Sequence, residues 1–193
     1  IDDFSSVIAL KPEEHAAYAS RGVSYGTMGD TMRAAADFEM AVRLNKNDDV
    51  SFANLGLSYE KLMEFDKSFK ALNASLSINP DNLPALAERC WVRAILGTEL
   101  DQAIADCDRA IKISPQDPNL YNSRGFTYFK MKNYDRAISD YSKSIVGNPS
   151  IGSSYYVRGL AHAAIGNAEL AETDVLKAVE LESGVAERYR KYG

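Results

Sequence analysis

The sequence predicts an all-α fold in which antiparallel helical hairpins stack into a solenoid. Small residues recur at intervals of 34, 34, 35 and 34 residues, at Gly22, Gly56, Cys90, Gly125 and Gly159. A second ladder of small residues has the same steps in a slightly different order and runs through Ala34, Ser68, Ala103, Ala137 and Ala171. Self-similarity at this period is typical of helical repeat proteins. Small residues at two fixed points of a hairpin also let its helices approach closely.

A third ladder marks the end of each repeat. It consists mostly of prolines and runs through Pro12, Lys46, Pro80, Pro115, Pro149 and Ser183. Proline cannot continue a helix and commonly follows one. Each repeat therefore holds two helices, and the second ends just before this ladder.

The expected elements form one array over residues 1–193. The second helix of a truncated repeat occupies 1–14, and its missing partner helix leads us to expect a fragment of a longer protein, cut inside a repeat. A C-terminal helix occupies 186–193 and is either a solvating cap or the start of a further, truncated repeat. Five complete repeats lie between them, at 15–48, 49–82, 83–117, 118–151 and 152–185.

The third repeat is one residue longer than the others, and we place the extra residue in the turn near Thr98 and Glu99. In this register Cys90 joins the ladder of small residues, whereas an insertion before the first helix would put the bulky Trp91 there. Turns absorb insertions more readily than helix interiors. The register has one cost, because it aligns Arg93 with the tyrosines of other repeats.

Arginine and aspartate recur together in four of the five repeats, and both are absent from the second. Joint presence and joint loss predict an ion pair between the two helices of each hairpin; two unrelated surface charges are the alternative. Such a pair fixes register more than it adds net stability, because desolvation offsets much of the Coulomb attraction. The predicted pairs are Arg21–Asp37, Arg89–Asp106, Arg124–Asp140 and Arg158–Asp174.

The fourth repeat shows the shared pattern most fully. Its residues at the recurring positions are Tyr121, Arg124-Gly125, Tyr128, Ala137, Tyr141, Ser144 and Pro149. This pattern resembles that of the tetratricopeptide repeat family, and the resemblance covers essentially the whole chain. It implies a right-handed superhelix whose first helices line a concave groove, and a role as a protein–protein interaction scaffold or adaptor.

By that resemblance, a ladder of apolar side chains points into the groove. We expect the partner-binding residues to be Val23, Leu57, Trp91, Ile95, Asn122, Phe126, Phe129, Tyr156 and Leu160. Exposed apolar patches of this kind favour an amphipathic helix or an extended apolar peptide as the ligand. The alternative is that these side chains belong to the core. A two-carboxylate clamp of the kind known in the family is excluded, because only Asn54 matches its required residues.

Composition and the reactive residues exclude several functional classes. The chain has 22 Lys and Arg residues against 27 Asp and Glu, a net charge of −5, and no basic stripe typical of a nucleic-acid binder. No apolar run approaches the roughly 18–20 residues needed to span a bilayer. His15 and His162 have no neighbours at metal-ligand spacing, so we expect no metal, no cofactor and no enzymatic activity.

The two cysteines do not decide whether the protein belongs to the cytoplasm or to an oxidising compartment. Cys90 and Cys107 lie on the facing helices of one hairpin, about one turn out of step. We favour buried free thiols that fill core positions; a disulfide is the alternative and would indicate an oxidising compartment rather than the cytoplasm.

The sequence therefore predicts a non-catalytic adaptor that captures an apolar or amphipathic protein segment. Two alternatives to this function stay open. One is a structural segment of a longer array that self-associates through exposed terminal helices, and the other is a receptor for a small hydrophobic ligand.

Overall fold

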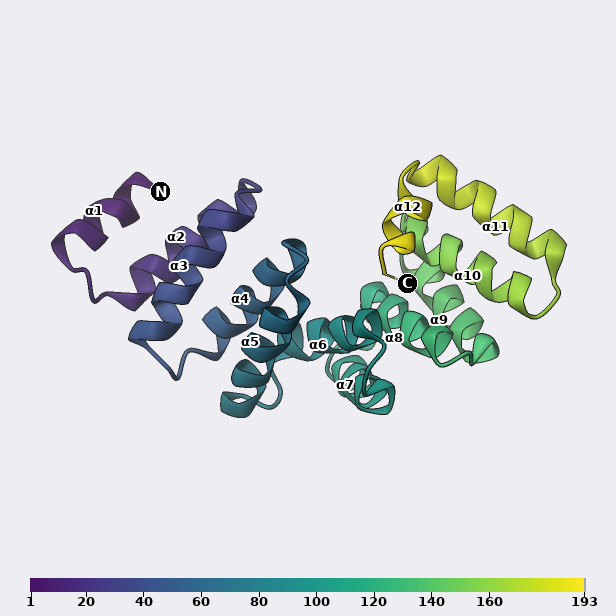
Figure 1. Ribbon diagram of the computed structural model, residues 1–193, viewed down its shortest axis with the longest axis horizontal. Coiled ribbons are helices and arrows are strands. Elements are labelled where there is room, and N and C mark those ends of the chain that lie inside the picture. Colours follow the sequence, from purple (N-terminus) through teal and green to yellow (C-terminus); the bar gives the residue numbers. More distant parts are fainter. Residues whose placement is uncertain (193) are drawn as a thin grey trace. The chain divides into compact units, whose positions relative to one another are not determined.

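The computed structural model describes residues 1–192 and confirms the all-α fold class. Within this part of the chain there are twelve helices and no strand (Figure 1). The helices are α1 (Asp2–Leu10), α2 (His15–Thr27), α3 (Thr31–Leu44), α4 (Asp49–Lys61), α5 (Phe65–Ile78), α6 (Leu83–Leu96), α7 (Leu100–Ile113), α8 (Pro118–Lys130), α9 (Tyr134–Gly147), α10 (Gly152–Ala164), α11 (Ala168–Leu181) and α12 (Val185–Arg190).

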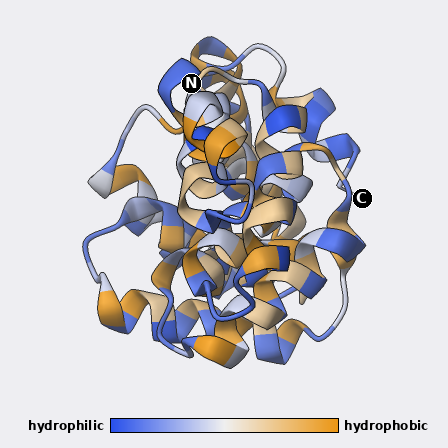
Figure 2. Ribbon diagram, turned by 90° about the vertical axis from the view of Figure 1, so that its left-hand side faces the viewer, coloured by the Kyte–Doolittle hydropathy of each residue, from blue (hydrophilic) through white to orange (hydrophobic). Residues whose placement is uncertain are grey.

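The helices pack as consecutive hairpins within two compact units. The first unit spans Ile1–Val92 and the second Arg93–Gly193, so the boundary falls inside α6. In the first unit α2 pairs with α3 and α4 with α5; in the second α8 pairs with α9 and α10 with α11. Each unit is therefore a stack of helix pairs. Figure 2 shows that the helices carry both hydrophilic and hydrophobic residues, which fits one face buried in a stack and another exposed.

The ladder of small residues sets how closely the two helices of a hairpin approach. A Cβ atom added at Gly125 would lie 3.1 Å from the ring of Tyr141, which is fully buried. At Gly56 the added atom would lie only 2.6 Å from Leu72. The glycine thus provides the space that the large side chain of the second helix fills. Equivalent pairs are Gly22 with Phe38 and Gly159 with Val175.

The structure places the extra residue of the third repeat where the sequence register put it, between the starts of its two helices. α6 begins 34 residues after α4, whereas α7 begins 35 residues after α5. In this connection both Gly97 and Glu99 adopt left-handed backbone conformations, with φ of 66° and 49°. The corresponding connections of the other repeats each contain one left-handed residue, namely Gly29, Met63, Lys132 and Gly166. A second left-handed residue therefore accompanies the insertion.

Candidate functional site

Ion pairs connect the two helices of three hairpins with the same geometry. Arg124 donates from Nε and Nη2 to the two carboxylate oxygens of Asp140, at 2.6 and 2.7 Å, and Asp140 is 2% exposed. The guanidinium also lies between the rings of Tyr121 and Tyr128, 5.7 and 5.9 Å from their centroids. This two-point contact holds the hairpin in register. The equivalent pairs are Arg21–Asp37 and Arg158–Asp174, each at 2.8 Å.

The third repeat uses an arginine that the sequence analysis treated only as a cost. Arg93, which takes a tyrosine position, is buried, and its guanidinium donates to Asp106 and, at 3.1 Å, to Glu99. Arg89 donates to Asn73 at 2.8 Å. The pairing of Arg89 with Asp106 stays a prediction.

In the first unit, the face formed by α2 and α4 is open. Val23 is 51% exposed and Leu57 is 39% exposed, and both line a hollow of about 260 Å³ between these helices. Asn54 and Lys61 supply polar groups at its edge. This part of the predicted ladder is therefore accessible to a partner.

Trp91 lies farther along the same unit and is only partly exposed. Its indole nitrogen donates to Glu60 Oε1 at 3.2 Å. Nearby, the Oε1 atom of Glu88 is buried without a hydrogen-bond partner among the described residues. Burial, and then the neighbouring carboxylate of Glu60, raise the pKa of Glu88 to about 8, while Lys61 opposes the shift. This shift favours the uncharged form of Glu88 at neutral pH, and the residue lies on α6, the first helix of the third repeat.

In the second unit, helix α12 covers part of the predicted ladder. α12 packs against α10 and α11, and Figure 1 shows it beside α10. The ring of Tyr189 lies 5.4 Å from that of Phe126 on α8 and 5.8 Å from that of Tyr156 on α10. We call the surface formed by Phe126, Lys130 and Tyr156 the aromatic seat, because a ring of the chain's own C-terminal segment rests on it.

A second tyrosine completes this contact. Tyr192 lies 5.5 Å from Tyr189 and 6.5 Å from Phe126, measured between ring centroids. Its backbone carbonyl accepts a hydrogen bond of 3.0 Å from Lys130 Nζ, which also lies 5.8 Å from the Phe126 ring centroid. Burial lowers the pKa of Lys130, and burial raises that of Tyr189 despite an opposing hydrogen bond with Ser153.

The prediction that the whole ladder is open to water is therefore wrong for three residues. Phe126 is 3% exposed, Ile95 8% and Asn122 9%. Asn122 belongs to a buried polar network and donates to the hydroxyls of Ser153 and Ser154, at 3.2 and 2.7 Å. A buried amide needs such partners, so this side chain has a structural role.

The remaining ladder residues of the second unit are partly exposed. They are Phe129, Tyr156 and Leu160. The Phe129 ring lies 5.7 Å from that of Tyr134, at the start of α9. Tyr156 alone of the three has a ring contact with the C-terminal segment among the contacts described. Aromatic contacts thus join α8 to the start of α9 and α10 to α12.

The cysteine expectation is corrected by the structure. Cys90 and Cys107 are both disulfide-bonded, and neither is a free thiol. Both are fully buried, as expected for core positions. The error lies in the small helical offset, which the sequence analysis treated as too large to favour a bridge.

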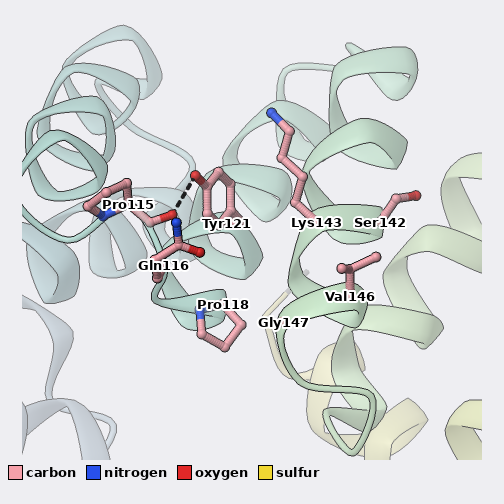
Figure 3. Close-up of a pocket in the computed structure, with 8 residues that line it drawn as sticks. All are labelled: Pro115, Gln116, Pro118, Tyr121, Ser142, Lys143, Val146 and Gly147. Carbon is pink, nitrogen blue, oxygen red and sulfur yellow. Dashed lines mark hydrogen bonds between the residues drawn. The ribbon is translucent and has the colours of Figure 1, made fainter.

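A second hollow lies where the α7–α8 connection meets α9. It has a volume of about 430 Å³, and Figure 3 shows Tyr121 and Lys143 at one side and Pro118 at the other. The hydroxyl of Tyr121 donates to the Pro115 carbonyl at 2.9 Å, which fixes the wall of the hollow. The described residues of its lining offer the Lys143 ammonium group, the polar groups of Gln116 and Ser142 and apolar surface, and they include no carboxylate.

Metal binding and membrane spanning find no support in the described part of the chain. Among residues 1–192, no group of three or more His, Cys, Asp or Glu side chains is arranged to hold a metal ion. No helix in the same part combines the length and apolar character needed to cross a bilayer.

Comparison with family models gives the chain its family. A model described as TPR repeat matches residues 99–132, and models described as tetratricopeptide repeat match residues 124–185 and 51–82. Together these matches cover more than half of the chain. The chain belongs to the tetratricopeptide repeat family. Proteins of this family mediate protein–protein interactions, and their repeat scaffolds are generally non-catalytic.

Curated relatives match only part of the chain. The BBSome complex member BBS4 of Bos taurus is 28% identical over 107 residues, which are 55% of this chain and 20% of that protein. The Mus musculus protein of the same name is 27% identical over 103 residues, 53% of this chain and 19% of that protein. The chain spans about a fifth of the length of these relatives.

Solved structures agree with the tetratricopeptide fold over most of the chain. MamA 41-end from Desulfovibrio magneticus RS-1 matches with a TM-score of 0.73 and 16% identity, over 88% of this chain and 96% of that one. YrrB, described as a TPR protein with an unusual peptide-binding site, matches with a TM-score of 0.71 and 18% identity, over 97% of each chain. At these identities the likeness shows the fold.

Proposed function

We propose that this tetratricopeptide chain is a non-catalytic scaffold that binds an apolar or amphipathic segment of a protein partner on the first-helix faces of its repeats. The residues proposed to contact the partner are the accessible ladder residues of the first unit, with Trp91, and the aromatic seat of the second unit. Ile95 and Asn122 are buried and are not among the proposed contacts.

One observation carries the proposal. The aromatic seat already holds a helical segment, because Tyr189 of α12 packs edge-on against Phe126 and also contacts Tyr156. Aromatic anchors in well-packed pockets dominate the energetics of protein interfaces. A surface that accepts such a segment from its own chain has the shape and chemistry to accept one from a partner. The peptide-binding site named for YrrB is a property of that protein and agrees with this proposal in kind.

The proposal is tested by affinity capture with the wild-type chain and two variants. We expect Trp91→Ala and Phe126→Ala each to reduce capture of the partner by at least tenfold. A matched control is Leu176→Ala, since Leu176 is 65% exposed on α11, outside the proposed surface. Because Phe126 is buried, circular dichroism and thermal melting accompany each variant to show that the fold is retained. Unchanged capture by both folded variants would contradict the proposal.

A second candidate function is self-association. It is favoured by the apolar side chains on α1, where Leu10 is 83% exposed and Val7 is 38% exposed. Sedimentation velocity at increasing concentration tests it. Self-association predicts oligomers that disappear in the Val7→Ser, Leu10→Ser double variant, whereas a monomer at all concentrations contradicts it.

A further inference from the structure

We propose that residues 185–192 are a displaceable internal ligand of the aromatic seat, and that the external partner is a short helix with two aromatic side chains three residues apart. This inference rests on the proposed function and names the partner class for that surface. It also implies that the partner must compete with the chain's own C-terminal segment.

The internal ligand has the pattern of an amphipathic helix that docks through one stripe. Val185 and Tyr189 are four residues apart and share one face of α12, and Tyr192, just past the end of the helix, brings its ring to Phe126 and Tyr189 as well. Val185 and Tyr189 are buried, whereas Glu187 and Arg190, on the other side, are exposed. The buried stripe is what the second unit recognises, and the charged side chains keep the segment soluble.

The helical form of this segment depends on its seat. α12 has only six residues, and helices shorter than about 12–15 residues are marginal in water on their own. The segment also follows exposed residues at Ser183 and Gly184. The segment is held by side-chain contacts rather than by its own helical turns: the ring contacts of Tyr189 and Tyr192, the hydrogen bond from Lys130, and an ion pair of 2.8 Å between Arg188 and Glu182. A ligand that offers the same contacts to the seat would therefore compete with it.

Each contact at the aromatic seat indicates a chemical group that the partner must supply. The edge-on ring contacts with Phe126 require an aromatic side chain at the Tyr189 position, and the second ring contact requires another at the Tyr192 position. The hydrogen bond from Lys130 goes to a backbone carbonyl, which any peptide can offer. The tyrosines therefore supply selectivity, and Lys130 fixes the backbone of the segment just past the end of the helix.

Competition has a measurable consequence. When an internal segment fills the site most of the time, the apparent dissociation constant rises in inverse proportion to the open fraction. Removing the two tyrosines should open the site without removing its receptor residues. A peptide with the sequence of residues 183–192 should then bind more tightly to the opened chain than to the wild type.

The experiment measures fluorescence anisotropy of that labelled peptide with full-length chains. We expect Tyr189→Ala, Tyr192→Ala to bind at least tenfold more tightly than wild type. The matched control, Glu187→Ala, Arg190→Ala, changes the exposed side of the same helix and should behave as wild type. Adding Phe126→Ala to the opened chain should abolish binding, and a peptide with both tyrosines replaced by alanine should not bind.

The outcomes separate this inference from the proposed function. Equal affinity for wild type and the opened chain would overturn the internal competition, although the seat would still bind peptide. No binding to either chain, with partner capture still dependent on Phe126, would overturn the partner class alone. If melting shows that the opened variant is unfolded, hydrogen exchange on the wild type decides. Faster exchange in residues 185–192 on adding excess peptide supports displacement, and unchanged exchange contradicts it.

Discussion

Tyr189 stands edge-on to Phe126, with ring centroids 5.4 Å apart and ring planes at 83°. The two residues lie on α12 and α8, so the segment that carries α12 reaches across one repeat to meet an earlier one. An edge-on pair of this kind adds roughly 0.5–1.5 kcal/mol beyond the burial of its area. The contact explains why Phe126 is buried although it belongs to the predicted binding ladder.

The ion pair between Arg124 and Asp140 should stabilise its hairpin. Asp140→Asn removes the charge from a buried carboxylate and leaves Arg124 partly unpaired, so we expect unfolding free energy to fall by about 3 kcal/mol. Asp135→Asn is the control, because Asp135 is exposed in the first turn of α9 and should cost less than about 1 kcal/mol. Urea unfolding measures both. Equal losses in the two variants would show that the pair has no special role.

Two glycines should respond oppositely to the same substitution. At Gly56 a Cβ would lie 2.6 Å from Leu72, so Gly56→Ala should destabilise the chain by about 1–3 kcal/mol through overpacking. At Gly26, in the helix α2, the added atom would lie 3.9 Å from Ala34, an ordinary contact. Gly26→Ala should stabilise by about 0.5–1 kcal/mol, because alanine loses less backbone entropy. Thermal melting compares the two, and a gain at Gly56 would contradict the packing argument.

Glu88 should make stability depend on pH. Its pKa is about 8 in the folded chain, against an ordinary value of 4.5, so between these values the folded state keeps a proton that the unfolded state has lost. The contribution is fully present below pH 4.5 and is lost as pH rises to about 8, at up to about 1.4 kcal/mol per pH unit.

Glu88→Gln should remove this slope and make the chain more stable than wild type above pH 8. Melting between pH 4.5 and 9 measures the effect. Glu172→Gln, on the exposed side of α11, is the control and should run parallel to the wild type. Parallel curves for Glu88→Gln and wild type would show that the Glu88 carboxyl is not the source.

The disulfide should be visible in solution. Intact mass should rise by about 2 Da on reduction, as two thiols form. A disulfide constrains the unfolded chain, typically by about 2–4 kcal/mol, so reduction should lower the melting temperature. The Cys90→Ser, Cys107→Ser variant should melt at the same temperature with and without reductant. An unchanged mass for the untreated and reduced wild type would contradict the bond.

The periodic parts of the fold could be predicted from the sequence because they depend on local pattern. The small residue at Gly125 and the large one at Tyr141 repeat at fixed spacing, and so does the charge pair of Arg124 and Asp140. These features are read one hairpin at a time. The extra residue near Glu99 was placed by the same alignment.

The features that could not be predicted depend on side-chain contacts that do not recur from repeat to repeat. Tyr189 aligns with Tyr155 of the preceding repeat, but alignment does not reveal that its ring reaches Phe126. Arg93 looked like a misfit because it takes a tyrosine position and bonds to Asp106, the carboxylate that the repeat pattern assigns to Arg89. The disulfide required a helix offset finer than sequence spacing resolves. In each case the feature depends on how close two particular side chains lie, and no other repeat contains the same pair.

The central claim is that the first-helix face of α8 and α10 is the ligand surface, and photo-crosslinking tests it most directly. A peptide of residues 183–192 carrying benzoylphenylalanine at the Tyr189 position is irradiated with the Tyr189→Ala, Tyr192→Ala chain, and the products are mapped by mass spectrometry. We expect the label on residues of α8 and α10 around Phe126 and Tyr156. Labelling confined to α9 and α11, or spread evenly over the chain, would contradict the account.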